Sequence, residues 1–417
     1  MRQKIKNIIQ TLLKKSASFL KTDTRYLAHG GFWLTLAQII STGSGFLLSV
    51  AFANLLPQET YGTYKYILSI LSLLSIPTLS GMNTAIVRAA ARGYDGTLKP
   101  ALNAKMRWGT LSAVGSLALA SYYYFLGANN QLAMAFLVAA VFLPFMDSFT
   151  LFDSHLQGKK KFDITTKYNT VIKIVATLSM VATLFFTSKI IFILLAYLAP
   201  YTIIRLVYLK ITLKKHLDNN KIESGALSYG FHLTAISILA NITTQLDSIL
   251  MWHYLNPTSL AIYAMALAPI NQIKSLLKSF VVISMPKMAE QDKEIIKKSL
   301  PLKIIKSILI LSIFIIALIF VLPYVYKIFF PKYLESIKYA QLLALTLILF
   351  PERLLSISTL VHANKKIIYF TNILNPAFKI LLLFLLLPTY GISGAIAAIL
   401  VQQIIFIFVD YYFFKKM

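Results

Sequence analysis

Basic side chains inside long apolar segments are the residues of this chain best placed to do chemistry. Lys274 and Lys278 stand one helical turn apart within 258–284, and Lys379 stands near the middle of 367–388. A charge at the centre of a bilayer costs about 2.5–3.5 kcal/mol on insertion scales, so these residues should face an internal cavity or a carboxylate. Excess positive charge in such a cavity suits an anionic solute, because charge-assisted hydrogen bonds replace the lost hydration of phosphate oxygens.

Other polar residues within apolar segments extend this candidate set. The predicted binding residues are Lys274, Lys278, Lys379, Arg88, Lys173, Arg353 and Asn241. Asp147, Asp247 and Glu352 are candidates for binding a coupling proton or sodium ion, because a buried carboxylate changes charge as a cavity opens. Two alternatives stay open: Lys173 and Arg205 snorkel to the interface, or the charges form internal ion pairs such as Lys173 with Asp147.

Enzyme chemistry has little support in the sequence. The chain has no cysteine, which excludes disulfides, thiol catalysis and thiolate metal sites. No Walker or Rossmann glycine pattern occurs, and the histidines lack metal-ligand spacing: His155, His232, His253 and His362. We therefore predict no catalytic residue, no metal and no cofactor beyond a coupling H+ or Na+.

The composition shows which kind of scaffold must position these side chains. Of 417 residues, 57% are hydrophobic and 13% are charged, with a mean hydropathy of +0.69. Apolar runs of about 20 residues recur along the chain, which is the signal of membrane-spanning helices. The net charge of +26 lies mainly in alternate loops, so it indicates membrane topology and anionic lipid rather than nucleic acid. The fold class is an all-α polytopic membrane protein.

Hydropathy predicts about twelve spans. Their approximate limits are 31–55, 66–87, 108–127, 131–156, 167–187, 190–211, 229–252, 258–284, 304–326, 338–362, 367–388 and 391–413. Basic residues, Lys105 among them, gather in every second connection: 88–107, 159–161, 210–221, 287–298 and 365–366. By the positive-inside rule, both termini are cytoplasmic.

The chain divides into two lobes around a polar linker. Residues 212–228 contain Asp218-Asn219-Asn220 and Ser224-Gly225, which are breaker signals. The predicted units are an N-terminal segment 1–30, an N-lobe 31–211, the linker 212–228 and a C-lobe 229–414. Apolar residues at helical spacing among lysines in 1–30 favour an amphipathic helix on the inner leaflet, with a disordered basic tail as the alternative.

An internal repeat relates the two lobes. Gly31 matches Gly230 and Tyr64 matches Tyr263, a shift of 199 positions (230 minus 31). Each lobe begins with a span that carries polar residues on one helix face: Gln38, Thr42, Gly45 and Ser49, then Ser237, Asn241, Thr244 and Ser248. The stripes predict either helix packing or the wall of a cavity at the lobe interface, where transporters often place their substrate.

The first two spans resemble the oligosaccharide flippases, the polysaccharide-export branch of the multidrug/oligosaccharidyl-lipid/polysaccharide exporter superfamily. The resemblance lies in Tyr-Gly-Thr-Tyr at 61–64, Ser69, and Ser-Gly-Met-Asn-Thr-Ala-Ile-Val-Arg at 80–88. It implies two six-helix lobes in a V that open alternately to either side. It also implies a polyprenyl-pyrophosphate-linked oligosaccharide as cargo, such as an O-antigen (lipopolysaccharide) or capsule repeat unit, flipped across the bacterial plasma (inner) membrane.

The same resemblance implies a polysaccharide polymerase and chain-length proteins as partners. Two departures favour this branch: the first span lacks a carboxylate, and the chain stops at about twelve spans rather than continuing with two more. In the expected mechanism, Lys274, Lys278 and Lys379 bind the pyrophosphate, and Arg88 and Lys173 lie at the cytoplasmic mouth. The alternatives are a cation-coupled multidrug exporter, an integral-membrane glycan or acyl transferase, and a scaffold for a glycan assembly complex.

Overall fold

The computed structural model describes residues 24–290, 293–362 and 365–416, and every regular element in these ranges is a helix. A helix satisfies its backbone hydrogen bonds within its own segment, which is why apolar chains cross membranes in this form. Among the described residues, nine helices are long and apolar enough to span a bilayer, or up to ten if one bent pair forms a single span. The predicted helical membrane fold is confirmed, and the count of about twelve spans stays a prediction.

The N-lobe comprises the elements from α2 to α9. They are α2 (Thr24–Leu55), α3 (Gln58–Leu74), η1 (Ile76–Thr78), α4 (Gly81–Ala91), η2 (Asp95–Thr97), α5 (Leu98–Phe125), α6 (Asn130–Met146), η3 (Ser148–Thr150), α7 (Leu151–Gly158), α8 (Phe162–Phe186) and α9 (Ile190–Lys215). Most of the predicted segment 1–30 lies outside the described residues.

The C-lobe comprises the elements from α10 to α15. They are α10 (Ala226–Tyr254), α11 (Pro257–Glu290), α12 (Lys293–Phe329), η4 (Pro331–Tyr333), α13 (Ser336–Ile348), η5 (Phe350–Glu352), α14 (Arg353–His362) and α15 (Lys365–Lys416). Helix α15 contains two of the predicted spans, 367–388 and 391–413. Gly391 separates them with a non-helical backbone at φ 58° and ψ −137°.

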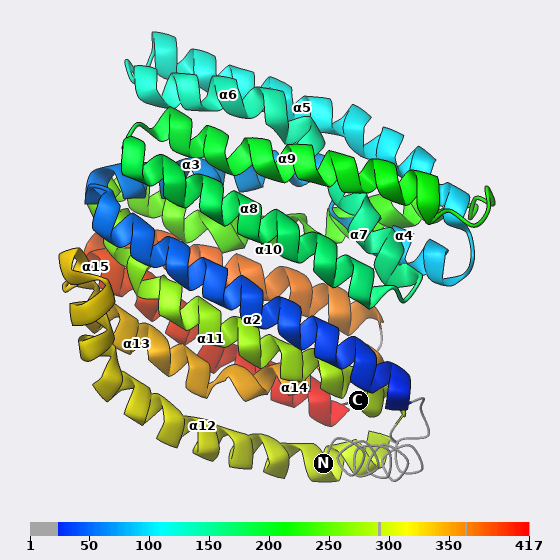
Figure 1. The fold of residues 1–417 in the computed structure, drawn as a ribbon. Coiled ribbons are helices and arrows are strands. Elements are labelled where there is room, and N and C mark those ends of the chain that lie inside the picture. Colours follow the sequence, from blue (N-terminus) through cyan, green and yellow to red (C-terminus); the bar gives the residue numbers. More distant parts are fainter. Residues whose placement is uncertain (1–23, 291–292, 363–364, 417) are drawn as a thin grey trace, which may run out of the picture.

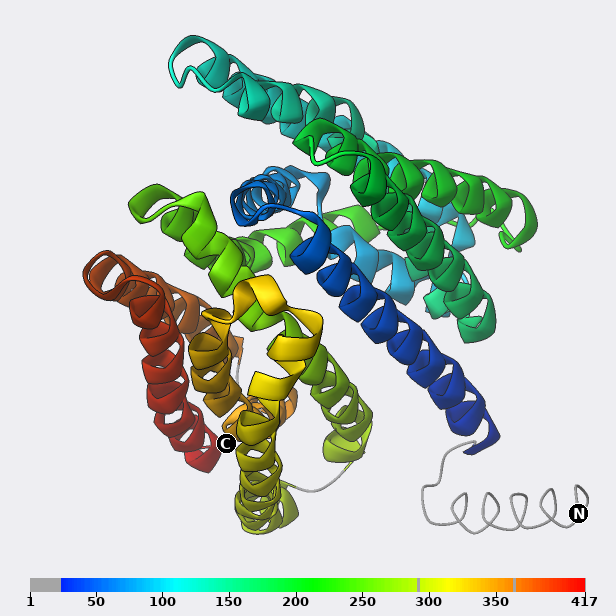
Figure 2. The same ribbon diagram turned by 60° about the vertical axis from the view of Figure 1, so that its left-hand side comes forward.

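The two lobes meet through a small number of helices. Helices α2, α3 and α4 of the N-lobe contact α10 and α11 of the C-lobe. The remaining helices lie to either side of this seam: α5, α6, α8 and α9 on one side and α12 to α15 on the other (Figures 1 and 2). In Figure 1 the basic loops lie at the right, and we call this the Lys/Arg-rich end; the opposite end is the charge-poor end.

One of the predicted spans is bent, and two others contain a short 3-10 turn. Span 66–87 bends by 44° between α3 and α4 at η1, which contains Pro77. Span 131–156 passes through η3 just after Pro144, and span 338–362 passes through η5, which contains Pro351. Proline removes a backbone donor and clashes with the preceding turn, which explains these positions. Both lobes thus place a carboxyl group, Asp147 or Glu352, at the 3-10 turn of their fourth span.

The lobes are packed together at the charge-poor end. One hydrophobic cluster there joins Phe52, Tyr61 and Tyr64 of the N-lobe to Tyr263 and Tyr326 of the C-lobe. A Cβ atom at Gly62 would lie 1.8 Å from the carbonyl oxygen of Pro257, so only glycine permits this crossing of α3 and α11. Asn54 donates to the carbonyl of Phe329 at 2.9 Å and accepts from the Lys332 ammonium through its own carbonyl at 2.7 Å. The structure is therefore closed at this end.

Candidate functional site

Four basic side chains gather in the C-lobe. Lys274 and Lys278 come from α11, Arg353 from the start of α14, and Lys379 from α15. The charges of Arg353, Lys379 and Lys278 all act on Lys274, as does the opposite charge of Asp247. Lys379 donates to the backbone carbonyl of Thr243 at 3.2 Å. Within the described part of the chain, none of the four bases forms an ion pair with a carboxylate.

A cavity of 570 Å³ adjoins this basic group between α10, α14 and α15. Its polar lining consists of Thr243, Thr244, Glu352, Arg353, Ser356, Thr371, Asn375, Lys379, Gln402, Gln403 and Asp410. The carboxyl groups of Glu352 and Asp410 are neighbours in this lining and interact with each other. Two neighbouring carboxyl groups repel when both are ionised. Asp410 was not among the predicted site residues.

Asp247 is buried within the C-lobe without an ion-pair partner among the described residues. Its carboxylate accepts a hydrogen bond from the Tyr263 hydroxyl at 2.7 Å and another from the backbone N–H of Ser248 at 2.8 Å. These donors replace part of the hydration that the carboxylate loses on burial. Asp247 therefore lies in a hydrogen-bonded position from which it acts on Lys274.

In the N-lobe, Asp147 pairs with Lys105. The Lys105 side chain is fully buried, and its ammonium lies 3.1 Å from Asp147 and 3.0 Å from the Asn83 side-chain oxygen. The Thr78 hydroxyl also donates to Asp147, at 2.7 Å. Pairing of Asp147 with Lys173 is therefore wrong. Lys105 was assigned to a basic loop, but α5 begins at Leu98 and carries Lys105 inside the lobe.

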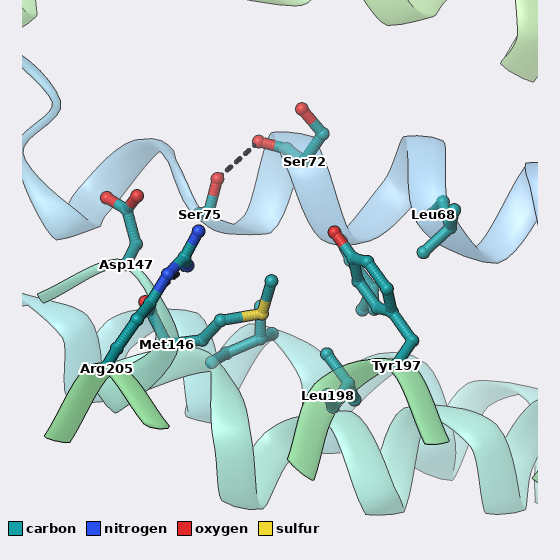
Figure 3. A pocket seen from close by; sticks show the side chains of 10 residues that line it. Leu68, Ser72, Ser75, Met146, Asp147, Tyr197, Leu198 and Arg205 are labelled. Carbon is teal, nitrogen blue, oxygen red and sulfur yellow. Dashed lines mark hydrogen bonds between the residues drawn. The ribbon is translucent and has the colours of Figure 1, made fainter. Parts of the chain in front are cut away.

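Arg205 lies between two further N-lobe cavities. One, of 220 Å³, has Asp147, Ser72 and Ser75 at the same end as Arg205 (Figure 3). The other, of 330 Å³, is lined by α2, α8 and α9 and contains both Arg205 and Lys173. Both basic residues thus line cavities of the N-lobe, and snorkelling of Lys173 and Arg205 to the membrane interface stays an alternative.

The sequence profile described as "Polysaccharide biosynthesis protein" matches residues 27–292, more than half of the chain. The chain belongs to the polysaccharide biosynthesis protein family. The resemblance seen in the first two spans is thereby confirmed. A comparison with curated protein sequences found no match.

Solved structures similar to this polysaccharide biosynthesis protein are membrane transporters. The lipid II flippase MurJ in an inward closed conformation has a TM-score of 0.65 and 16% identity, covering 91% of this chain and 86% of that chain. A MATE structure in complex with MaD5 has a TM-score of 0.62 and 13% identity, and the match covers 92% of this chain and 94% of that chain. A MOP superfamily transporter from Pyrococcus furiosus has a TM-score of 0.62 and 14% identity, and the match covers 93% of this chain and 95% of that chain. The chain thus shares the fold of these multi-pass membrane proteins over more than 90% of its length.

Of the seven predicted binding residues of this family member, only Arg353 and Lys379 line the C-lobe cavity. Lys274 and Lys278 on α11 are not part of its lining, although the charges of Arg353 and Lys379 act on Lys274.

The other three lie further away. Arg88 lies at the Lys/Arg-rich end, 3.6 Å from Glu223 and 4.8 Å from the centre of the Tyr229 ring. Asn241 lies on α10, but the cavity is lined there by its neighbours at 240, 243 and 244. Lys173 lines the 330 Å³ cavity of the N-lobe.

The polar stripe of α2 serves helix packing and also lines a cavity. The Gln38 amide donates to the Ser275 hydroxyl on α11 at 2.7 Å. A Cβ atom at Gly45 would meet the Gln272 amide at 2.5 Å. Gln38 also lines the 330 Å³ cavity of the N-lobe. Gln38 thus serves helix packing and lines a cavity, but this cavity lies within the N-lobe, and Thr244 of the second stripe lines a cavity within the C-lobe.

The segment 216–225 between the lobes is bound to the N-lobe. The Lys159 ammonium contacts Asp218 at 2.7 Å and the buried Asp95 at 3.1 Å. The hydrogen bond between Lys159 and Asp218 raises the pKa of Lys159 and lowers the pKa of the Asp218 carboxyl, since each group stabilises the charged form of the other. Further along, Arg92 pairs with Glu223 at 2.9 Å. The linker is therefore attached to the N-lobe as far as Glu223.

Proposed function

We propose that the chain is a flippase that moves a polyprenyl-pyrophosphate-linked oligosaccharide from the cytoplasmic to the outer leaflet for surface polysaccharide synthesis. The observation that carries this proposal is the set of four bases in the C-lobe, which have no carboxylate ion-pair partner among the described residues. A diphosphate presents several anionic oxygens, and basic side chains bind them through charge-assisted hydrogen bonds. Lys274, Lys278 and Lys379 would contact the diphosphate, and Arg353 would flank them.

Movement of the cargo follows from rocking of the two lobes. The sugar would occupy the polar cavity, while the prenyl chain stays in the lipid between the lobes. The closure at the charge-poor end, between Gly62 and Pro257, would separate during the transport cycle. Arg88 and Lys173 would attract the anionic head at the Lys/Arg-rich end, which the positive-inside rule places in the cytoplasm.

Coupling to an ion would use the C-lobe carboxyl groups. Glu352 and Asp410 are neighbouring carboxyl groups, one of which would take up and release a proton, and Asp247 is a buried carboxyl group that acts on Lys274. Asp147 is less suited to this role because Lys105 already neutralises it at 3.1 Å. The coupling ion would be H+ or Na+, and the host membrane would be the bacterial plasma (inner) membrane.

The decisive experiment follows the lipid-linked repeat unit in cells. Deletion of the gene should leave this unit on the inner leaflet, and the Lys274→Ala and Lys379→Ala variants should lower its delivery to the outer surface. Lys327→Ala, an exposed lysine at the charge-poor end of α12, is the matched control. Full delivery by both variants at normal expression would refute the assignment.

A second candidate is a cation-coupled multidrug exporter, favoured by the similarity of the fold to MATE structures. Drug sensitivity on deletion with an intact surface glycan would support it. Release of free lipid carrier or formation of new glycosidic bonds by the purified protein would instead indicate a glycan transferase. Polymerase and chain-length proteins remain the expected partners of the flippase.

A further inference from the structure

The 330 Å³ cavity of the N-lobe has a basic lining without a carboxylate. Its walls come from α2, α8 and α9, and its polar side chains are Gln38, Ser41, Asn169, Thr170, Lys173, Tyr201 and Arg205. The volume lies at the lower limit of ligand cavities, which span about 300–1,000 Å³. The C-lobe cavity differs, because Glu352 and Asp410 contribute acidic groups to its lining.

The two basic side chains of this cavity retain free donors. Lys173 has neither a hydrogen bond nor an ion pair with any described residue. Arg205 donates one N–H group to the carbonyl of Met146 at 2.9 Å and places its guanidinium 4.9 Å from the centre of the Tyr201 ring. A guanidinium has five N–H donors, so most of them stay available for a ligand. The two cations also repel each other, since Arg205 acts on Lys173.

The nearby carboxylates are already bound to other groups. Asp147 has Lys105 at 3.1 Å and Thr78 at 2.7 Å. Asp153 accepts hydrogen bonds from the Gln157 and Asn169 side chains, each at 2.8 Å. Arg205 influences both acids from beyond ion-pair distance. An unpaired charge removed from water is costly, and a bound anion would lower this cost for Lys173 and Arg205.

The cavity also adjoins the contact between the lobes. Gln38, one of its lining residues, donates to Ser275 of α11 at 2.7 Å. Ser275 directly follows Lys274, which belongs to the basic group of the C-lobe. A lining residue of the N-lobe cavity thus contacts α11 at the position next to Lys274.

We infer that the cavity between α2, α8 and α9 is an anion site for a phosphorylated lipid head group, which Lys173 and Arg205 bind through its phosphate oxygens. The ligand is either the diphosphate of a polyprenyl carrier or the phosphodiester of an anionic membrane lipid. The inference rests on the proposed function where the carrier is the source. It adds Arg205, which was not predicted as a binding residue, and it gives the N-lobe its own contact with the head group.

The test is binding to the full-length protein in nanodiscs of phosphatidylcholine. One arm titrates a sugar-free polyprenyl diphosphate, and the other titrates phosphatidylglycerol. For Lys173→Gln and Arg205→Gln we expect the Kd of at least one ligand to rise about tenfold or more, the effect of losing a charged hydrogen bond. Lys167→Gln is the matched control, because Lys167 is an exposed lysine on α8 that lies 5.5 Å from the Trp33 ring.

The pattern across the arms identifies the source. A loss confined to the diphosphate assigns the site to the carrier, and a loss confined to phosphatidylglycerol assigns it to bilayer lipid. Wild-type affinity for both ligands in both variants would overturn the inference, as would an equal loss in Lys167→Gln. Lys173→Arg should restore binding and thereby exclude misfolding as the cause. The cellular assay is separate: if deletion strands no lipid-linked repeat unit, the proposed function fails, yet the binding result stands.

Discussion

Removing one partner of the Lys105–Asp147 ion pair should destabilise the protein by an amount that depends on which partner is lost. Lys105 is fully buried on α5, whereas 36% of the Asp147 side chain is exposed on the cavity wall. Asp147→Ala would leave the ammonium with Asn83 as its remaining hydrogen-bond partner, at 3.0 Å. Lys105→Met would leave a carboxylate that water in the cavity can reach and that still accepts from Thr78.

The magnitudes follow from this difference in burial. An unpaired buried charge costs about 3–5 kcal/mol, and we expect Asp147→Ala to lie in this range. Lys105→Met should cost about 1–2 kcal/mol, since the remaining carboxylate keeps one hydrogen bond and partial hydration. The double variant should be more stable than Asp147→Ala alone, because it buries no unpaired charge. The coupling energy between the two positions should then exceed about 1 kcal/mol.

Equilibrium unfolding in mixed micelles of SDS and mild detergent measures these free energies. Ser112→Ala is a useful control, since it shortens another fully buried side chain of α5 without changing charge. Equal losses in the two single variants would refute the reasoning from burial. A double variant with a lower free energy of unfolding than Asp147→Ala would contradict the expected cost of the unpaired ammonium.

Two other perturbations test the closure and the linker. Gly62→Ala should destabilise the closed charge-poor end by about 1–3 kcal/mol, because the new Cβ would meet the Pro257 carbonyl; Gly43→Ala, where a Cβ meets nothing within 4 Å, should stabilise its helix. A cysteine pair at positions 54 and 332 should form a disulfide under oxidising conditions when this end is closed and fail to form one when it is open, which is unambiguous in a chain without cysteines. The Lys159–Asp218 pair should make proteolysis of 216–225 depend on pH. The pKa of Asp218 is lowered in the folded protein, so its stabilisation is present above about pH 4 and is lost as pH falls through the folded pKa. The pKa of Lys159 is raised, so its contribution is present below about pH 10.4 and is lost as pH rises through the folded pKa. Cleavage that stays constant down to pH 2, or that Lys159→Met leaves unchanged at pH 7, would contradict the pair.

The sequence predicted the fold class and, among the residues that line the C-lobe cavity, Glu352, Arg353 and Lys379. Long apolar runs require membrane helices, and the cost of a buried ammonium predicts that Lys274 and Lys379 avoid lipid. The repeat also has a structural counterpart: Tyr64 and Tyr263, which match across the shift, are both buried in the cluster that joins the lobes. These predictions rest on local properties of the chain, such as hydropathy, spacing and the solvation of single charges.

Features that depend on tertiary contacts were missed. Hydropathy averages over a bend, so 66–87 is predicted as straight although it bends by 44° near Pro77. The pairing of Lys105 with Asp147 joins residues 42 positions apart, and the contact between Glu352 and Asp410 joins η5 to α15. No periodicity in the sequence encodes which cation reaches which carboxylate, because several arrangements place both on inward helix faces.

The attachment of the linker limits how the lobes can move. Hydrogen bonds and ion pairs hold 216–223 against the N-lobe, and α10 begins at Ala226. Between them, Gly225 has φ 83°, and a Cβ there would meet nothing within 4 Å. Rotation about the backbone of Ser224 and Gly225 is then the main freedom at this joint. A gene divided after Glu223 should yield two polypeptides that reassemble when co-expressed, because each would keep its own contacts and lose only this short tether.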